Sequence, residues 1–201
     1  NLHSAGSLSG FGTGLTESQM TSYMARMNYG FKDRYLLTAS VRWDGSSVLA
    51  PGHKWATFPS AALAWRIDQE DFMKDINWIS QLKLRLGFGV TGNAAIDPYS
   101  TKGAIQSLYY QWGSESPSIG YLPSDVKMAN NELTWEKTTQ YNVGIDYGFL
   151  NNRISGSVDV YKTKTKDLLL DMTIPSLTGY VSTLANVGKT SGWGIDLQLN
   201  A

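Results

Sequence analysis

Residues 82–91 read Leu-Lys-Leu-Arg-Leu-Gly-Phe-Gly-Val-Thr, and this stretch decides the fold because its apolar and polar positions alternate without a break. Successive side chains of a β-strand point to opposite faces, so this pattern predicts a strand with one apolar and one polar face. The expected apolar row is Leu82, Leu84, Leu86, Phe88 and Val90, opposite Lys83, Arg85, Gly87, Gly89 and Thr91.

Six other segments alternate in the same way, which brings the expected number of strands to about seven. They are residues 23–29, 35–44, 60–67, 140–147, 154–160 and 192–199. Their lengths approach the ~9–11 residues that a tilted strand needs to cross a bilayer. No apolar run approaches the ~18 residues of a membrane-spanning helix. If this chain enters a membrane, it enters as strands.

The connections between these segments alternate in length. Residues 44–58, 92–133 and 164–188 are long and rich in Gly, Ser and Thr, whereas Phe31–Arg34 and Phe149–Arg153 are short. Asp68–Gln81 falls on the short side and contains a predicted helical turn at residues 70–74. An extra hairpin is expected around residues 105–112. Outer-membrane barrels show this asymmetry, with long loops outside and short turns inside.

Composition narrows the class of protein. Charged residues make up 17% of the 201 residues, against ~25% in soluble domains, and aromatic residues make up 12%. Acidic and basic residues number 17 each, so no net charge exists to attract nucleic acid. Cysteine is absent, which excludes disulfides and thiolate metal sites. The chain begins at Asn1 without a signal peptide, which we interpret as missing upstream sequence.

Alternation alone leaves two architectures open, a membrane barrel and a soluble carbohydrate-binding β-sandwich. Aromatic residues gather at the ends of the expected strands, as in the two girdles of a membrane barrel. Charges sit in mid-strand on the polar faces, and none lies on the apolar faces within the cores of the expected strands. In a barrel these charges would line a wet lumen. The residues are Arg26, Arg42, Arg66, Lys83, Arg85, Asp146, Asp159 and Asp196.

Several motifs, in order along residues 23–199, resemble the barrel of SusC/RagA-like TonB-dependent transporters. Residues 35–42 followed by Asp44-Gly45-Ser46-Ser47 resemble the family's strand and DGSS loop, and residues 82–93 resemble its LKLR and GxTGN signature. Further similar segments are Phe58-Pro59-Ser60, 64–67, 70–72, 133–137, 142–146, Asp159-Val160-Tyr161 and Asn186-Val187-Gly188. Singly these motifs are weak, and their shared order and spacing carry the resemblance.

The resemblance implies an all-β fold: an antiparallel transmembrane β-barrel segment of about seven strands, left open as a fragment of a larger plugged barrel. Residues 1–201 would then form part of the barrel, without the plug domain or the closing strands. Val48 and Leu49 stand where the family more often has Arg and Phe. A seven-stranded piece cannot close a barrel of roughly 22 strands.

The family further implies a function in the outer membrane of a Gram-negative bacterium. The parent protein would import a large nutrient, an oligosaccharide or a peptide, from a SusD-like surface lipoprotein, driven by the TonB complex. The lumen charges would hold the plug. A passive porin is the alternative if no plug exists, and a soluble carbohydrate-binding sandwich is the alternative outside the membrane.

Exposed loop aromatics are the candidate ligand-binding residues, because flat rings stack on sugar rings. They are Tyr109, Tyr110, Trp112 and Tyr121. The alternative is that these rings pack the loop or meet the lipoprotein, and Trp55 has the same ambiguity. Trp43 and Trp65 are expected to be anchors at the lipid interface. With two histidines and no phosphate loop or serine elbow, we expect no enzyme, no cofactor and no metal.

Overall fold

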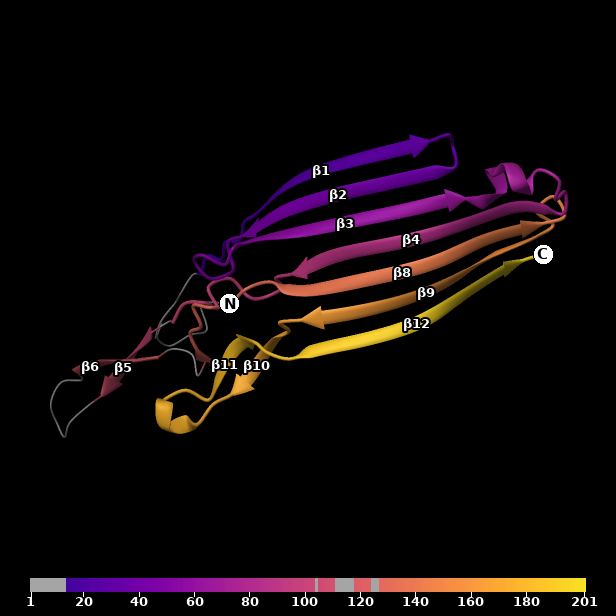
Figure 1. The fold of residues 1–201 in the computed structure, drawn as a ribbon. Helices are drawn as coiled ribbons and strands as arrows, with labels where there is room; N and C mark the ends of the chain where they lie inside the picture. Colours follow the sequence, from indigo (N-terminus) through magenta and orange to yellow (C-terminus); the bar gives the residue numbers. More distant parts are fainter. Residues whose placement is uncertain (1–13, 104, 111–117, 124–126) are drawn as a thin grey trace, which may run out of the picture.

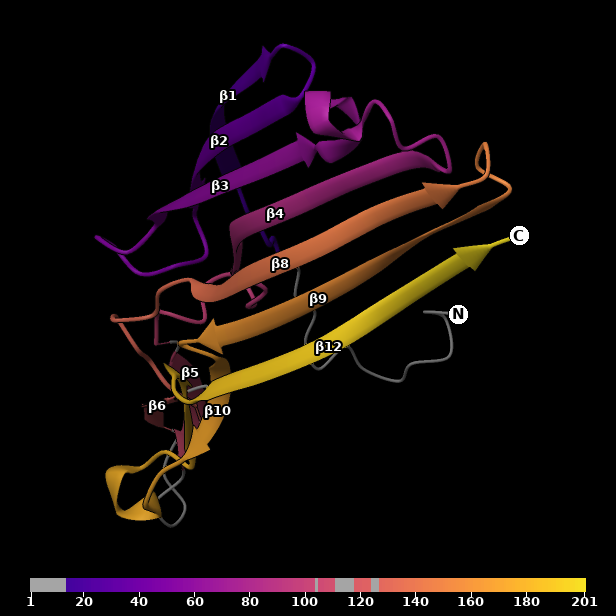
Figure 2. The ribbon, with the colours of Figure 1, turned by 45° about the vertical axis from the view of Figure 1, so that its right-hand side comes forward.

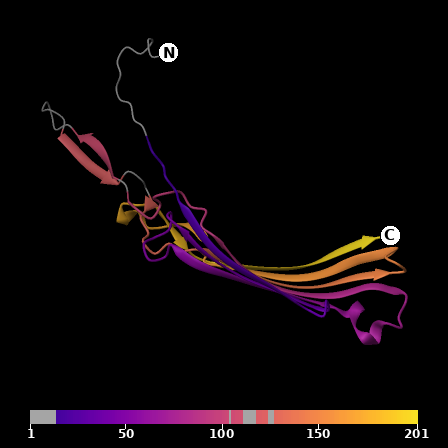
Figure 3. The same cartoon turned by 90° about the horizontal axis from the view of Figure 1, so that it is seen from above.

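The computed structural model describes residues 14–103, 105–110, 118–123 and 127–201. Seven antiparallel strands form one sheet in the order β1-β2-β3-β4-β8-β9-β12, so every strand pairs with its neighbours along the chain apart from inserted loop strands. The strands lie side by side in a single curved layer (Figures 1 and 3). They are β1 (Met20–Phe31), β2 (Tyr35–Ser46), β3 (Trp55–Arg66), β4 (Ile79–Asn93), β8 (Glu136–Phe149), β9 (Ile154–Lys166) and β12 (Lys189–Asn200).

The seven predicted strands are confirmed and form this one antiparallel sheet, but each strand is longer than its alternating segment. The sequence placed Trp55 in a loop, yet it begins β3 and pairs with Gly45. Likewise β9 continues to Lys166 and pairs there with Lys137 and Lys189. Alternation is needed only where one face is apolar, so it disappears beyond that zone while the ladder of hydrogen bonds goes on.

Short and long connections lie at opposite ends of the sheet (Figure 1). At the short end, Lys32 and Asp33 have φ values of 51° and 55°, which gives the tight turn between β1 and β2 its two left-handed residues. Asn151 and Asn152, expected to tolerate turn geometry, have φ values of 58° and 61°. The predicted helical turn near residue 70 is two 3₁₀ turns, η2 (Ile67–Gln69) and η3 (Asp71–Met73).

The long connections contain further strands, which lie beyond the end of the sheet (Figures 1 and 3). The expected extra hairpin is present as β5 (Ile105–Tyr110) paired with β6 (Ser118–Pro123). The connection after β9, expected only as a long loop, contains β10 (Leu169–Thr173) paired with β11 (Ser182–Asn186). The short β7 (Lys127–Met128) joins β11 in parallel, and η4 (Ser176–Thr178) closes the β10–β11 hairpin.

The two faces of the seven-stranded sheet differ as the alternation predicts. The apolar face exposes large side chains, including Trp193 at 75%, Leu197 at 75% and Leu199 at 68%. No second sheet covers it in the part of the chain that the structure describes. A sandwich would bury these rows, so the soluble-sandwich alternative is wrong. Among the described residues, no helix has the length and apolar character to cross a membrane.

Aromatic side chains form clusters at both ends of the apolar face. At the long-loop end, Trp43 lies 4.6 Å from Trp55 and 6.1 Å from Tyr23 between ring centroids. At the short-turn end, Tyr35 stacks on Trp65 at 6.2 Å. The rings of Trp78, Tyr147 and Phe149 form a further cluster at that end.

Candidate functional site

The polar face carries a network of ion pairs across three strands. Arg85 on β4 donates from Nε to Asp146 Oδ1 at 2.9 Å and from Nη2 to Asp159 Oδ2 on β9 at 2.9 Å. Lys83 Nζ lies 3.6 Å from Asp146 Oδ2. Two positive and two negative groups therefore neutralise one another within the wall. The planar guanidinium, with several donors in a fixed arrangement, suits this double contact.

Gly144 makes the network possible, because it lies between Arg85 and Asp159 in the register of the sheet. A Cβ at this position would meet Asp159 Oδ1 and would lie 2.8 Å from Arg85 Nη2. The missing side chain lets the Arg85 guanidinium pass across β8 to reach β9.

Two further predicted charges pair with carboxylates near their own position in the chain. Arg66 Nη2 donates to Asp68 Oδ2 at 3.1 Å, and Arg42 Nε donates to Asp44 Oδ2 at 2.7 Å. Asp44 is completely buried, and its Oδ1 has no hydrogen-bond partner among the described residues. The sequence analysis placed Asp44 in a segment that resembles the DGSS loop. It did not predict that the Asp44 side chain is buried.

Register places all eight predicted charges on the polar face. Six of them are paired within the wall itself. Arg26 on β1 and Asp196 on β12 have no ion-pair partner in the described residues, and both lie on edge strands of the sheet. Whether any of the eight contacts a plug stays a prediction.

The predicted ligand-binding aromatics lie on the β5–β6 hairpin. Tyr109 pairs with Ile119 and Tyr121 with Ser107, which puts Tyr109 and Tyr121 on the same face of the hairpin, while Tyr110 points to the other. All three rings are more than half exposed, at 67%, 52% and 69% for Tyr109, Tyr110 and Tyr121. Trp112 lies outside the described residues. The sugar-stacking role stays a prediction.

A small apolar core, which sequence reasoning missed, ties the long loops together. It consists of Val48, Leu49, Ala56, Phe58, Leu133 and Trp135, and we call it the loop core. Phe58 and Trp135 meet edge-on at 5.3 Å, and Trp135 Nε1 donates to the main-chain oxygen of Lys54 at 2.9 Å. The one sequence feature that could have indicated this core is the adjacent apolar pair Val48-Leu49 in an otherwise polar loop.

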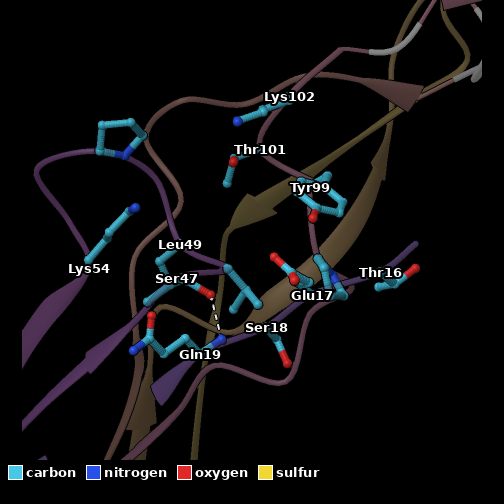
Figure 4. A pocket seen from close by; sticks show the side chains of 13 residues that line it. Thr16, Glu17, Ser18, Gln19, Ser47, Leu49, Lys54, Tyr99, Thr101 and Lys102 are labelled. Carbon is cyan, nitrogen blue, oxygen red and sulfur yellow. Dashed lines mark hydrogen bonds between the residues drawn. The ribbon is translucent and has the colours of Figure 1, made fainter. Parts of the chain in front are cut away.

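A polar cavity of about 770 Å³ adjoins the loop core (Figure 4). Three chain segments line it: residues 16–19 before β1, residues 47–54 between β2 and β3, and residues 98–102 after β4. This cavity was not predicted, because the three segments that line it are far apart in the chain.

At the short-turn end, hydrogen bonds to Glu70 connect β2 and β3 to the 3₁₀ turns. Its Oε1 accepts hydrogen bonds from Trp65 Nε1 at 2.9 Å and from the Tyr35 hydroxyl at 2.7 Å. Its Oε2 accepts from Arg34 at 2.9 Å. The Trp65 bond, followed by the Tyr35 bond, holds the pKa of Glu70 below its ordinary value of 4.5.

Comparison with known proteins decides what kind of sheet this is. The model of the family described as "TonB dependent receptor-like, beta-barrel" matches residues 4–201. The chain belongs to this family. The predicted fold, an antiparallel transmembrane β-barrel segment, is thereby confirmed, as is the resemblance to SusC and RagA.

Two curated members of the receptor-barrel family illustrate how much is shared. The TonB-dependent receptor SusC of Bacteroides thetaiotaomicron is 42% identical over 190 residues, which cover 92% of this chain and 19% of SusC. The TonB-dependent receptor P26 of Formosa agariphila is 39% identical, over 90% of this chain and 18% of P26. The chain therefore spans about a fifth of these relatives.

Solved structures of outer-membrane receptors and importers match the fold of this chain. The RagAB peptide importer in its closed-closed state matches with a TM-score of 0.79 and 33% identity, over 90% of this chain and 19% of that chain. The siderophore receptor PirA of Acinetobacter baumannii matches at 0.61 with 17% identity over 92% of this chain and 26% of that one, which supports the fold alone.

The named relatives of this barrel segment are receptors and importers. Within the described ranges, no group of three His, Asp or Glu side chains is placed to hold a metal ion. That the chain is neither an enzyme nor a carrier of a metal or cofactor stays a prediction.

Proposed function

We propose that this chain forms part of the barrel wall of an active transporter in the outer membrane of a Gram-negative bacterium. The complete protein imports a large nutrient, an oligosaccharide or a peptide, into the periplasm. It receives the nutrient from a SusD-like surface lipoprotein, and the TonB complex supplies the energy. A plug domain and N-terminal parts of the complete protein make the TonB contact.

One observation carries the proposal. A single curved sheet exposes an apolar face between two clusters of aromatic rings and carries the eight predicted charges on the other face. Exposed apolar rows of this extent suit contact with lipid, and aromatic rings suit the two membrane interfaces. The structural likeness to an importer described as acting on peptides supports transport.

Within this proposal the wall has two roles. The paired charges hold neighbouring strands in register. Arg26 and Asp196, which have no ion-pair partner in the described residues, pair with groups on adjoining strands or on the plug. The exposed rings of Tyr109, Tyr110 and Tyr121 meet the nutrient or the lipoprotein at the long-loop end.

Uptake of labelled oligosaccharides and peptides by cells, with and without a protonophore, tests the proposal. Active transport predicts uptake that saturates with nutrient concentration, stops when the proton gradient is dissipated, and disappears when the gene is deleted. Uptake that rises linearly with nutrient concentration and is unchanged by the protonophore would instead indicate a passive porin.

A further inference from the structure

The cavity beside the loop core carries more positive than negative charge. Its lining includes two basic residues, Lys54 and Lys102, and one acidic residue, Glu17. In Figure 4 the two lysine side chains extend toward the cavity from different loops. Neither ammonium group has an ion-pair partner in the described part of the chain, and Lys102 Nζ lies 5.9 Å from the centre of the Tyr99 ring.

Hydroxyl groups add hydrogen-bond donors to this lining. Thr101 is 5% exposed, and its hydroxyl makes no hydrogen bond with the described residues. Ser47 Oγ accepts a hydrogen bond from Gln19 N at 2.8 Å, which leaves the Ser47 hydroxyl hydrogen free to donate.

The backbone holds these groups in place. The Lys54 main-chain oxygen accepts from Trp135 Nε1 and from Ser46 N at 3.0 Å, which fixes Lys54 to the loop core. Tyr99 has a φ of 68°, which is uncommon for a bulky residue and marks a position held by its surroundings. Lys102 N donates to Tyr99 O at 2.8 Å within this turn. A binding site benefits from such fixed positions.

We propose that this cavity binds a carboxylate group of the incoming nutrient, an inference that rests on the proposed transport function. Lys54 and Lys102 supply the charge, Ser47 and Thr101 supply hydrogen bonds, and the Tyr99 ring packs against the body of the ligand. A volume of about 770 Å³ lies in the range of about 300–1,000 Å³ usual for small-ligand sites. The carboxylate belongs to an acidic sugar or to an acidic peptide.

Binding and uptake by the full-length protein with its lipoprotein partner test this assignment. Each carboxylated probe is matched with a neutral one of equal length: an oligogalacturonate with a neutral galactose oligomer, and an acidic pentapeptide with its amidated glutamine analogue. We expect one acidic probe to bind about ten- to a hundredfold more tightly than its neutral match, as charge-assisted hydrogen bonds do. The pair that shows the difference identifies the source of the carboxylate.

Lys54→Gln combined with Lys102→Gln should abolish that difference by weakening the binding of the acidic probe. Lys32→Gln combined with Lys74→Gln removes the same charge at the opposite end of the sheet and should preserve the preference. Equal affinity for acidic and neutral probes, or a preference that survives in the Lys54/Lys102 variant, would overturn the assignment.

Failure of the transport function looks different from failure of this site. If neither probe pair is taken up in an energy-dependent manner, the transporter proposal falls. If neutral and acidic probes are both taken up with energy but without discrimination, only the carboxylate site is wrong.

Discussion

At residue scale, the absence of a side chain at Gly144 lets Arg85 form ion pairs with two carboxylates on two strands, those of Asp146 and Asp159. A methyl group there would lie 2.9 Å from Arg85 Cζ as well as against Asp159. We expect Gly144→Ala to displace the guanidinium and to lower the free energy of unfolding by about 1–3 kcal/mol, the usual cost of overpacking. Guanidinium unfolding of the full-length protein in detergent micelles measures this.

Gly89→Ala provides the matched control, since its Cβ would contact Ser60 Cβ at an ordinary 3.7 Å on the same polar face. Equal losses in the two variants would show that Arg85 does not depend on Gly144.

Glu70 gives the short-turn end a dependence on pH. Its folded-state pKa lies below the ordinary 4.5, so its contribution to stability is complete above that pH. The contribution is lost as the pH falls through the lowered folded-state pKa. Hence Glu70→Gln should unfold at a lower denaturant concentration than the wild type at pH 7, and the two should converge well below pH 4.5.

Glu132→Gln, which changes an exposed carboxylate in a long loop, should leave the midpoint unaltered at both pH values. A wild-type advantage over Glu70→Gln that persists at low pH would contradict the role given to the ionised carboxylate.

At the scale of elements, each strand separates its two faces residue by residue. On β8, Val143 is 47% exposed on the apolar face, and Gln140 lies on the polar face. Val143→Arg should destabilise the barrel by about 2–4 kcal/mol, the cost of an arginine near the middle of the bilayer. Gln140→Arg should cost far less, as judged by the same unfolding titration, and similar losses would contradict the assignment of faces.

The sequence predicts a strand only where one of its faces is apolar and the other polar, because only there do apolar and polar residues alternate. The rows of β4 and β8 followed directly from this alternation, but the outer half of β9, with Lys162, Lys164 and Lys166, is polar on both faces and showed no strand pattern. The β10–β11 hairpin was not predicted because its two strands are only five residues long and do not alternate. Trp135 and Leu49 gave no periodic signal, because the loop core and its cavity join segments distant in sequence.

At the scale of the whole molecule, the sheet is an open arc with β1 and β12 as its two edges (Figure 2). Relatives about five times as long contain such an arc within a complete receptor. The unpaired edges and the unpartnered Arg26 and Asp196 fit strands that continue on either side. The exposed apolar face fits lipid, and the self-neutralised polar face fits a wet interior.

Spin labels attached in turn at positions 140–143 and 145 of β8, in the full-length protein in bilayers, test this orientation most directly. This chain has no cysteine of its own to interfere with labelling. Labels at 141, 143 and 145 should collide mainly with dissolved oxygen, and labels at 140 and 142 mainly with a water-soluble nickel complex. Collision rates without this alternation, or alternation in the opposite phase, would contradict a wall whose apolar rows meet the hydrocarbon.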